Sequence, residues 1–569
     1  MAHNLDRSGD QEPQASADDD SDRPERRDEH RSRLDRRSYI KYSGLIGAAL
    51  AATTVSSADG STVRDGIEFP HRLHAVEDLD LDPTGETPVD RALEAVQDGS
   101  LIVFPDGNYR FESTPFDGSP SREKMGLEGI GDAVRFVSQT GSQRFLLDWE
   151  GMQSAYFENI DIDQRAVESC AGVRILGERV VIRDVDVIGG CDRQDGGLPV
   201  ISHATSASQG HSLVDNVSST ATSDVRPALG RPGIFVDPAH RGTVTVRNCE
   251  LSGFPDPAVY GARHSGSVQI RDSYFENNAA SIRLSNGGSS LRGSTIRVDE
   301  LPPAVSAANE RQFHHHAVAV ATDEPDGSVS EGTESLSIEE TTFEIGDLPG
   351  FYPAIVIPSG VSLPEIRDCH IEYGNDSQTV ILARNPGTND ATNPTPLRIR
   401  NLSVTGEGDV DSVIEVGSAY RPEISDSTVR MSNGNAVGLL LSGASGFSLE
   451  NTTVGVPNRP IVVTDEDNST LQQQYGCGHD SCLSRANTLC IEGDGTAANY
   501  ELTASGPVER NVDSTAAYGP SGRNTEGTVS TDAVRLSFDG RLTDFRVDGT
   551  ATLTLEQPGN LTDQCYRSG

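Results

Sequence analysis

Residues 157–162 read FENIDI, and residues 182–187 read IRDVDV. Both stretches consist of an apolar residue, any residue, Asn or Asp, two further residues and an apolar residue. We call the third residue the anchor. The same pattern recurs around further anchors, which are Asn248, Asp272, Asp368, Asn401, Asp426 and Asn451, with looser copies at Asn216, Gly293 and Glu340.

The spacing of these anchors predicts the fold. Successive anchors are 25, 32, 32, 24, 21, 47, 28, 33, 25 and 25 residues apart. One coil of a parallel β-helix takes roughly 20–30 residues, so each step is one coil with loops of varying length. The 47-residue step contains either a degenerate coil or an insertion over residues 298–336. We therefore expect an all-β chain that forms a right-handed, single-stranded parallel β-helix of about a dozen coils.

A second set of strands, apolar-x-apolar triplets, lies between the anchors. Side chains alternate across a strand, so the outer residues of each triplet fill the core and the middle one faces outward. The expected outward column is Arg174, Phe235, Tyr260, Arg283, Ala319, Val356, Ile381, Glu415, Leu439 and Val462. Neighbouring coils lie about 4.8 Å apart, which brings Phe235, Tyr260 and Arg283 together.

This column predicts a ligand and a covered surface. Aromatic faces and guanidinium groups bind sugar rings and carboxylates, so Arg174, Phe235, Tyr260 and Arg283 are the candidate substrate-binding residues. The later half of the column is apolar, and exposed it would be an unusually large apolar stripe. We expect a long loop, the C-terminal segment or a second copy of the chain to cover it.

Catalytic chemistry is expected beside the aromatic residues. A polysaccharide lyase needs a base and a positive group or metal, whereas an inverting hydrolase needs two carboxylates roughly 6.5–9.5 Å apart. No metal site is predicted, because no cluster of metal-ligating residues has the required spacing. Ca²⁺ is kept as a candidate cofactor without assigned ligands. The candidate catalytic residues are Asp237, His240, Arg263, His264 and Arg283.

The N-terminal part of the repeat region carries a family resemblance. Residues 88–96 have apolar positions at helical spacing, residues 101–104 form an apolar strand, and FPDGNY follows at 104–109 as a turn. This order resembles the N-terminal cap of the pectin-lyase-like β-helix superfamily. The resemblance covers residues 80–465 and implies a secreted protein that acts on or binds polysaccharides.

Three functions are weighed from these observations. The first is a polysaccharide-binding β-helix with lyase-type activity, and the second is a non-catalytic adhesive or structural surface protein. The third is a glycoside hydrolase or uronate epimerase. Asp237-Pro238-Ala239-His240 partly resembles the Asp-Pro-His-Asp signature of alginate epimerases, but Ala239 interrupts it.

The N-terminus predicts export. Arg36 and Arg37 precede Ser-Tyr-Ile-Lys and a short apolar run, which resembles a twin-arginine signal. The run is too short and too rich in Gly, Ala and Thr for a stable membrane span. We divide the chain into a disordered region (1–34), the signal (35–58), a linker (59–80), the β-helix (81–465) and a C-terminal β segment (466–569).

The charge composition restricts the environment and the partners. The chain has 86 Asp+Glu against 46 Lys+Arg, a formal net charge of -40, and lysine only at Lys41 and Lys124. Acids spread along the whole chain predict a surface adapted to high salt, similar to secreted haloarchaeal proteins. The same charge argues against nucleic acid as a partner, because binding phosphates needs clustered cations.

Cysteine use agrees with export. Cys170 and Cys191 lie near one coil and are expected to form a disulfide, while Cys249 and Cys369 are expected to be buried free thiols. Two further disulfides are expected in the C-terminal segment, among Cys477, Cys482, Cys490 and Cys565. Residues 534–555 read as short strands with turns at 539–540 and 548–549, either as a cap or as an accessory module. The cluster His314-His315-His316 is interpreted as part of a loop or strand edge.

Overall fold

The fold is seen in a computed structural model that describes most of the chain after residue 60. The described residues are 61–115, 122–191, 198–222, 231–284, 288–303, 316–320, 336–348, 353–358, 361, 363–384, 394–442, 447–457, 459–464, 487–493, 495, 497–511, 522–531, 533–538 and 542–556. The predicted export signal, with Arg36 and Arg37, and the cluster at His314 and His315 lie outside them.

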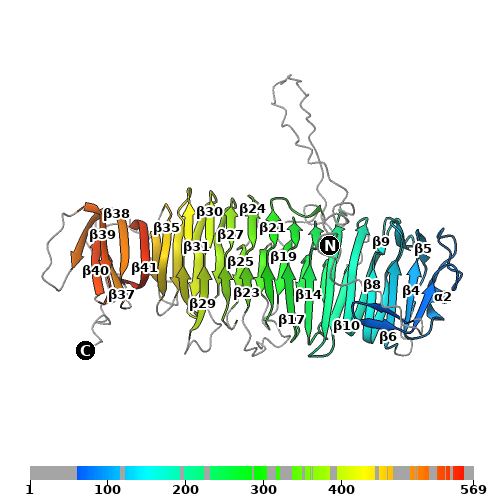
Figure 1. Cartoon of the computed structure of the whole chain (residues 1–569). Helices are drawn as coiled ribbons and strands as arrows, with labels where there is room; N and C mark the ends of the chain where they lie inside the picture. The colour runs from blue at the N-terminus through cyan, green and yellow to red at the C-terminus, as the bar shows by residue number, and fades with distance from the viewer. Residues whose placement is uncertain are drawn as a thin grey trace, which may run out of the picture. The chain divides into compact units, whose positions relative to one another are not determined.

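The described chain is a parallel β-helix with three faces, and the strands of successive coils lie side by side (Figure 1). The first face consists of β11 (Ile201–Thr205), β13 (Ile234–Val236), β16 (Val259–Gly261), β19 (Ala280–Leu284), β22 (His316–Val320), β25 (Ile355–Ile357), β28 (Ser377–Ala383), β31 (Val410–Gly417), β34 (Val437–Ser442) and β36 (Arg459–Thr464).

The second face is the longest ladder, and four of its strands, β8, β10, β12 and β35, continue onto neighbouring faces. It consists of β3 (His71–His74), β4 (Ser100–Phe104), β6 (Lys124–Gly129), β8 (Gln143–Glu158), β10 (Cys170–Ile188), β12 (His211–Thr220), β14 (Thr243–Arg247), β17 (Ser267–Arg271), β20 (Ser290–Arg292), β23 (Ser337–Glu339), β26 (Glu365–Arg367), β29 (Thr395–Arg400), β32 (Tyr420–Ser425) and β35 (Ser448–Gly455).

The third face completes each coil. It consists of β5 (Gly107–Phe111), β7 (Val134–Ser138), β9 (Asp161–Asp163), β15 (Glu250–Ser252), β18 (Tyr274–Glu276), β21 (Thr295–Val298), β24 (Thr342–Ile345), β27 (His370–Tyr373), β30 (Ser403–Gly406) and β33 (Thr428–Met431). The prediction of a parallel β-helix is thereby confirmed.

The anchor residues are the corners between the second and third faces. Every one of them has a positive φ, from 46° at Asn451 to 60° at Gly293. Asn and Asp tolerate this left-handed conformation better than other residues with a Cβ, which explains why they recur there. The repeat in the sequence is therefore a repeat of one backbone turn.

Most of the corners are also hydrogen-bonded to the next coil. The Asn401 backbone N–H donates to the Ser425 carbonyl at 3.0 Å, and the Asp426 N–H donates to the Glu450 carbonyl at 2.9 Å. The side chains continue this ladder, because Asn401 Nδ2 donates to Asp368 Oδ1 at 2.8 Å and Asn451 Nδ2 donates to Asp426 Oδ1 at 3.0 Å. The corners therefore hold neighbouring coils in register.

The 47-residue step is a single coil with an insertion. Strand β20 pairs directly with β23, and β21 pairs directly with β24, so no further coil lies between them. The extra residues flank β22, which pairs with β19 and β25 on the first face. The insertion alternative is therefore the correct one.

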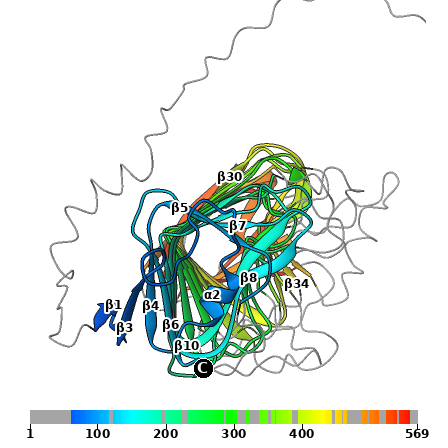
Figure 2. The same ribbon diagram turned by 90° about the vertical axis from the view of Figure 1, so that its right-hand side faces the viewer.

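The N-terminal end is capped, with two differences from the prediction. Helix α2 (Asp90–Glu94) lies at this end of the stack (Figure 2), and its Leu93 is buried in the core. The predicted linker 59–80 contains β3 and a hairpin of β1 (Thr62–Arg64) and β2 (Ile67–Phe69). The predicted turn at 105–109 is shorter than expected because β5 starts at Gly107.

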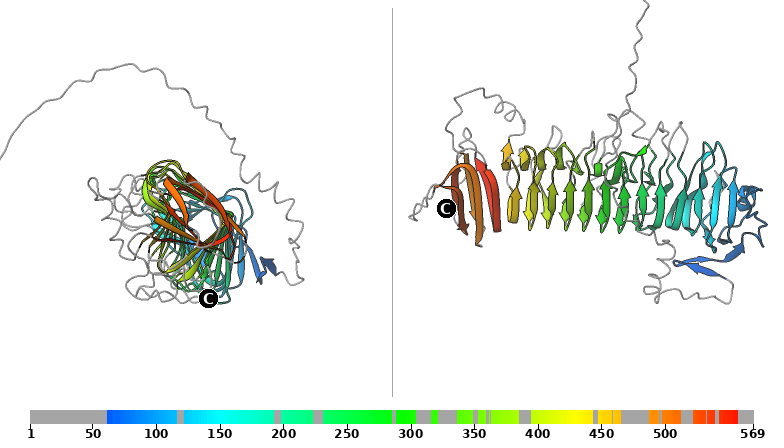
Figure 3. Two further views of the ribbon diagram at one scale, coloured as in Figure 1. Left: turned by 90° about the vertical axis from the view of Figure 1, so that its left-hand side faces the viewer. Right: turned by 90° about the horizontal axis from the view of Figure 1, so that it is seen from above.

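The C-terminal β segment caps the other end. Its strands are β37 (Asn487–Gly493), β38 (Ala498–Asn511), β39 (Gly522–Val529), β40 (Ala533–Phe538) and β41 (Leu542–Glu556), and they pair antiparallel with one another (Figure 3). Strand β41 also pairs antiparallel with β35, which covers the edge of the last coil. The turn predicted at 548–549 is wrong, since β41 runs through it.

The corner at Asn401 gives a stability prediction. Asn401→Ala places an alanine at φ 48° and removes the amide hydrogen bond, so it should lower the free energy of unfolding by about 2 kcal/mol. Asn401→Gly keeps the left-handed turn and should cost about 1 kcal/mol or less. Chemical denaturation of both variants measures the difference, and equal losses would contradict a conformational role for the anchor.

Candidate functional site

Three side chains on the first face form the aromatic strip, which we define as Phe235, Tyr260 and Arg283. The strand register places Phe235 beside Tyr260 and Tyr260 beside Arg283. The Phe235 and Tyr260 ring centroids are 5.4 Å apart, and Arg283 Cζ lies 5.2 Å from the Tyr260 centroid. All three side chains are partly exposed. The predicted juxtaposition is confirmed.

The rest of the outward column differs from the prediction at three places. Ser202 occupies the coil between Arg174 and Phe235, which the predicted column omits. Farther along, Val356 pairs with Leu382 and Glu415 pairs with Leu440. Ile381 and Leu439, which were expected to face outward, are instead core residues. The outward positions on these two strands are one residue later, at Leu382 and Leu440.

Arg174 is held by carboxylates rather than facing the strip. Its Nη1 lies 2.8 Å from Asp148 Oδ1 and 3.3 Å from Glu150 Oε2, and its Nη2 lies 4.0 Å from Asp237 Oδ2. The Asp237 carboxylate also accepts a hydrogen bond from the Ala239 N–H at 2.9 Å. Arg174 is thus already neutralised, and Asp237 is directed toward Arg174.

The apolar half of the column is buried within one chain. Val356 is 5 % exposed, Leu440 9 % and Val462 1 %. Leu440, Val462 and Val437 form an apolar cluster of their own outside the main core. The predicted homo-oligomer required an exposed apolar column, and these residues of the column are not exposed.

His240 and His264 are core residues and not exposed turn residues as predicted. His240 Nδ1 accepts from the Thr205 N–H at 3.1 Å, and its Nε2 donates to the Ser267 carbonyl at 3.0 Å. The His264 ring stands edge-on to the His240 ring at a centroid distance of 4.7 Å. His203, in the preceding coil, is also fully buried, and its Nδ1 donates to the Ile175 carbonyl.

Burial keeps these three rings neutral. It lowers the pKa of His203 to about 3 and of His264 to about 3, and it lowers the pKa of His240 as well. Two catalytic assignments are corrected on this ground, because a fully hydrogen-bonded His240 and a buried His264 do not reach a ligand. We call His203, His240 and His264 the histidine stack.

Asp256 is an acid beside the strip that the sequence did not single out. Its carboxyl is partly buried, and this burial raises its pKa to about 6, while the positive charge of Arg283 acts in the opposite direction. It lies in the turn before β16, whereas Arg263 lies exposed in the turn after it with φ 66°. The predicted catalytic residues all lie on the triplets or after them. Asp256 was not among them because its turn, Pro255-Asp256-Pro257, lies before the triplet of β16.

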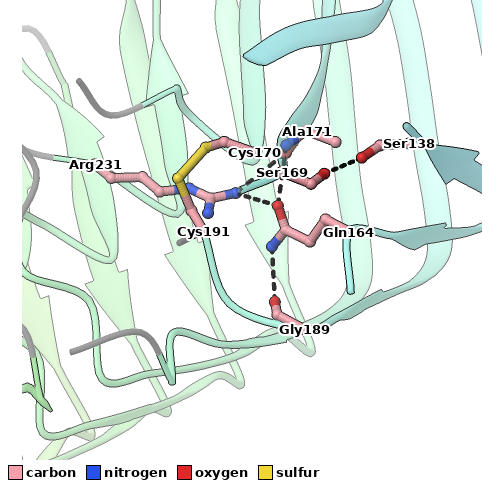
Figure 4. The surroundings of a disulfide bond; sticks show 8 residues. All are labelled: Ser138, Gln164, Ser169, Cys170, Ala171, Gly189, Cys191 and Arg231. Carbon is pink, nitrogen blue, oxygen red and sulfur yellow. Dashed lines mark hydrogen bonds between the residues drawn. A yellow bond between two sulfur atoms is a disulfide. The ribbon is translucent and has the colours of Figure 1, made fainter. Parts of the chain in front are cut away.

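The disulfide lies in a buried polar network at the start of β10 (Figure 4). Cys170 and Cys191 are bonded, with their Cα atoms 4.5 Å apart, as predicted. Arg231 Nη2 donates to Gln164 Oε1 at 3.0 Å and to the Ala171 carbonyl at 3.1 Å. Complete burial lowers the pKa of this guanidinium to about 9. The network ties three coils together.

The other cysteines divide into two groups. Cys249 and Cys369 are buried free thiols, as predicted. Cys477, Cys482 and Cys565 lie outside the described residues, and only the backbone of Cys490 is described, in β37. The proposed C-terminal disulfides therefore stay predictions.

The described residues contain neither a metal-ligand cluster nor a membrane-spanning helix. No group of three or more His, Cys, Asp or Glu side chains in this part of the chain is arranged to hold a metal ion. Within the same residues, no helix has the length and apolar character required to cross a membrane.

Comparison with known proteins gives matches among solved structures alone. No family model and no curated protein matches the chain. The surface adhesin PfbA of Streptococcus pneumoniae is 13% identical, with 74% of this chain and 97% of that chain covered and a TM-score of 0.40. A double mutant of the tailspike protein of E. coli bacteriophage HK620 is 9% identical, with 86% and 94% covered and a TM-score of 0.39.

A third matching structure is the tailspike gp49 from Acinetobacter baumannii bacteriophage Fri1, described as a capsular polysaccharide depolymerase. It is 11% identical, the match covers 87% of this chain and 89% of the tailspike chain, and the TM-score is 0.33.

The histidine stack predicts acid sensitivity. A histidine whose pKa is lowered on folding binds its proton only in the unfolded chain, so its contribution to stability falls as pH drops below about 6.5 toward 3. His264→Asn retains a donor for the Gly266 carbonyl but does not titrate. Between pH 6 and 4 the free energy of unfolding should fall less steeply for this variant than for the wild type. The two slopes should differ by about 1.4 kcal/mol per pH unit, the contribution of one titrating group. Parallel pH dependences for both proteins would show that His264 is not buried as a neutral ring.

Proposed function

We propose that the protein binds a polysaccharide on the aromatic strip. The observation that carries this proposal is the Tyr260 ring, which is partly exposed between Phe235 and the Arg283 guanidinium. An aromatic face packs against the apolar face of a sugar ring, and a guanidinium donates to sugar hydroxyls or carboxylates. Adjacent coils about 4.8 Å apart supply successive contacts for an extended chain.

The site favours binding over the lyase-type activity considered from the sequence. A lyase needs a base that takes a proton from the substrate, and the two histidine candidates are buried. The other two candidates, Arg263 and Arg283, are arginines, and a guanidinium group does not act as a base. Among the described candidates this leaves Asp237, which is directed toward Arg174.

A second candidate function is glycosidic-bond hydrolysis, and Asp256 is the observation that favours it. A carboxyl whose pKa is raised to about 6 retains its proton in mildly acidic solution and can serve there as a general acid. Asp237 follows β13 whereas Asp256 precedes β16, so the two acids flank opposite ends of the parallel strands. An epimerase reaction has no comparable support, because its expected signature includes the buried His240.

We further propose that the protein works outside the cell and is exported through the twin-arginine route. The disulfide between Cys170 and Cys191 is typical of proteins in oxidising compartments. The Arg36-Arg37 pattern and the acidic composition, with a net charge of -40, support export in a folded state from a salt-rich cell. A requirement for Ca²⁺ stays open in this proposal.

Substitution on the strip tests the proposal directly. Tyr260→Ala and Arg283→Ala should each weaken binding to the preferred polysaccharide by about tenfold, because each removes a direct contact. Tyr274→Ala is the matched control, since Tyr274 is a partly exposed tyrosine on the third face. Binding is measured by calorimetry in high salt on a panel of uronate-containing and neutral polysaccharides. Unchanged binding by both strip variants would refute the proposal, and product analysis of the same mixtures tests cleavage.

Asp256 gives a prediction for pH. Below its pKa of about 6 the carboxyl is neutral and no longer offsets the positive charge of Arg283, so binding of a uronate polysaccharide should strengthen as pH falls from 7.5 to 5. Asp256→Asn should bind as the wild type does at pH 5 and show no such pH dependence. A wild-type affinity that is constant over this range would contradict the role of Asp256.

A further inference from the structure

The second face changes character partway along its length. Its central outward column begins with Leu101, Gly126, Tyr156, Val181 and Leu213. The β1–β2 hairpin covers these residues, because Ile67 and Phe69 pack in one apolar cluster with Leu101, Tyr156 and Val181. Over the following coils the same column continues as polar residues, which are Thr245, Gln269, Ser290 and Ser337. The polar part therefore starts where the hairpin ends.

Arginines line one edge of this polar part. Arg247, Arg271 and Arg292 are register partners on β14, β17 and β20, each immediately before a corner residue. Arg271 is exposed, and the side chains of Arg247 and Arg292 are 37 % and 54 % exposed. Like charges on adjacent strands repel one another, so this arrangement has an energetic cost in the free protein. We call these three residues the arginine ladder.

The ladder is incompletely neutralised. Arg247 Nη2 pairs with Asp215 Oδ2 at 2.7 Å, on the side of the preceding coil. Arg292 Nη2 pairs with Glu340 Oε1 at 2.9 Å, on the side of the following coil. Among the described residues, no carboxylate forms an ion pair with Arg271, which lies between them. The outward side chains of β14, β17 and β20 are Thr243, Thr245, Arg247, Ser267, Gln269, Arg271, Ser290 and Arg292, and none is acidic.

We propose that the arginine ladder binds an extended anionic polysaccharide, with carboxylate or sulfate groups on successive guanidinium groups. The three cations repeat about every 4.8 Å, and the neighbouring hydroxyl and amide groups can bond to sugar hydroxyls. A guanidinium donates two parallel hydrogen bonds to a carboxylate or sulfate. This local surface is cationic on a chain of net charge -40, which favours an anion at the ladder and disfavours highly charged nucleic acid nearby.

This site is separate from the aromatic strip although the same coils carry both. The strip uses β13, β16 and β19 on the first face, whereas the ladder uses β14, β17 and β20 on the second. Of the histidine stack, His240 and His264 lie in the turns between these faces, and His203 lies on β11 of the first face. The protein would therefore present two neighbouring faces to glycans, and the second face would select those that carry negative charge.

The experiment compares charge reversal at two positions of one column. The mature protein, Arg271→Glu and Arg400→Glu are titrated with polygalacturonate, dextran sulfate and neutral dextran at two salt concentrations. Arg400 belongs to the same column and its side chain is 55 % exposed, but Glu365 Oε1 lies 4.0 Å from its Nη1. Arg271→Glu should weaken binding of either anionic polymer about tenfold, and Arg400→Glu should leave it nearly unchanged. Binding of the wild type should weaken as salt is raised.

Further variants separate this proposal from the one for the strip. In a Tyr260→Ala background, Arg271→Glu should still weaken binding of the anionic polymers about tenfold, and Arg271→Gln should give a smaller loss than Arg271→Glu. Thermal unfolding of each variant verifies that it is folded. Equal losses for Arg271→Glu and Arg400→Glu, no loss for Arg271→Glu, or tighter binding of a single-stranded oligonucleotide than of both anionic polymers would each overturn the proposal.

Discussion

The structure depends on one backbone turn, the left-handed corner that recurs between the second and third faces. At most of these corners a residue with positive φ donates its N–H to the coil that follows, as Asn401 does to Ser425. Because the turn recurs once per coil, it sets how far each coil is displaced from its neighbour. A shift of one residue would reverse which side chains face the core. The core and both candidate surfaces therefore depend on these corners.

The fixed register between coils places single residues of successive coils side by side in columns, and both proposed binding sites are such columns. On the first face it stacks Phe235, Tyr260 and Arg283, and on the second it stacks Arg247, Arg271 and Arg292. Neither set is contiguous in sequence, and each is regular because the coils are. The buried His240 and His264 lie in the turns between the two faces, where His240 hydrogen-bonds to the backbones of Thr205 and Ser267. In both proposals the ligand therefore binds a face of the coil stack.

The fold could be predicted from the sequence because the corner chemistry is local. Asn and Asp mark a left-handed position where they recur at coil spacing, and the spacing alone identifies the looser copies at Gly293 and Glu340, which also have positive φ. The phase of the outward column failed at Ile381 and Leu439, because every residue of those runs is apolar and either phase fills a core. Burial of His240 and His264 could not be predicted, since it depends on which distant turns stack above them. Asp256 was missed for the same reason, as its pKa is set by its surroundings.

The most direct test of the account is a crystal structure of the mature protein with an oligosaccharide from whichever polysaccharide it binds. If the aromatic strip is the binding site, a sugar ring packs on Tyr260, and the oligosaccharide runs across successive coils between Phe235 and Arg283. A sugar bound away from the first face, with the Tyr260 ring uncovered, would contradict it. In that case the aromatic strip would be a structural feature of the coil stack.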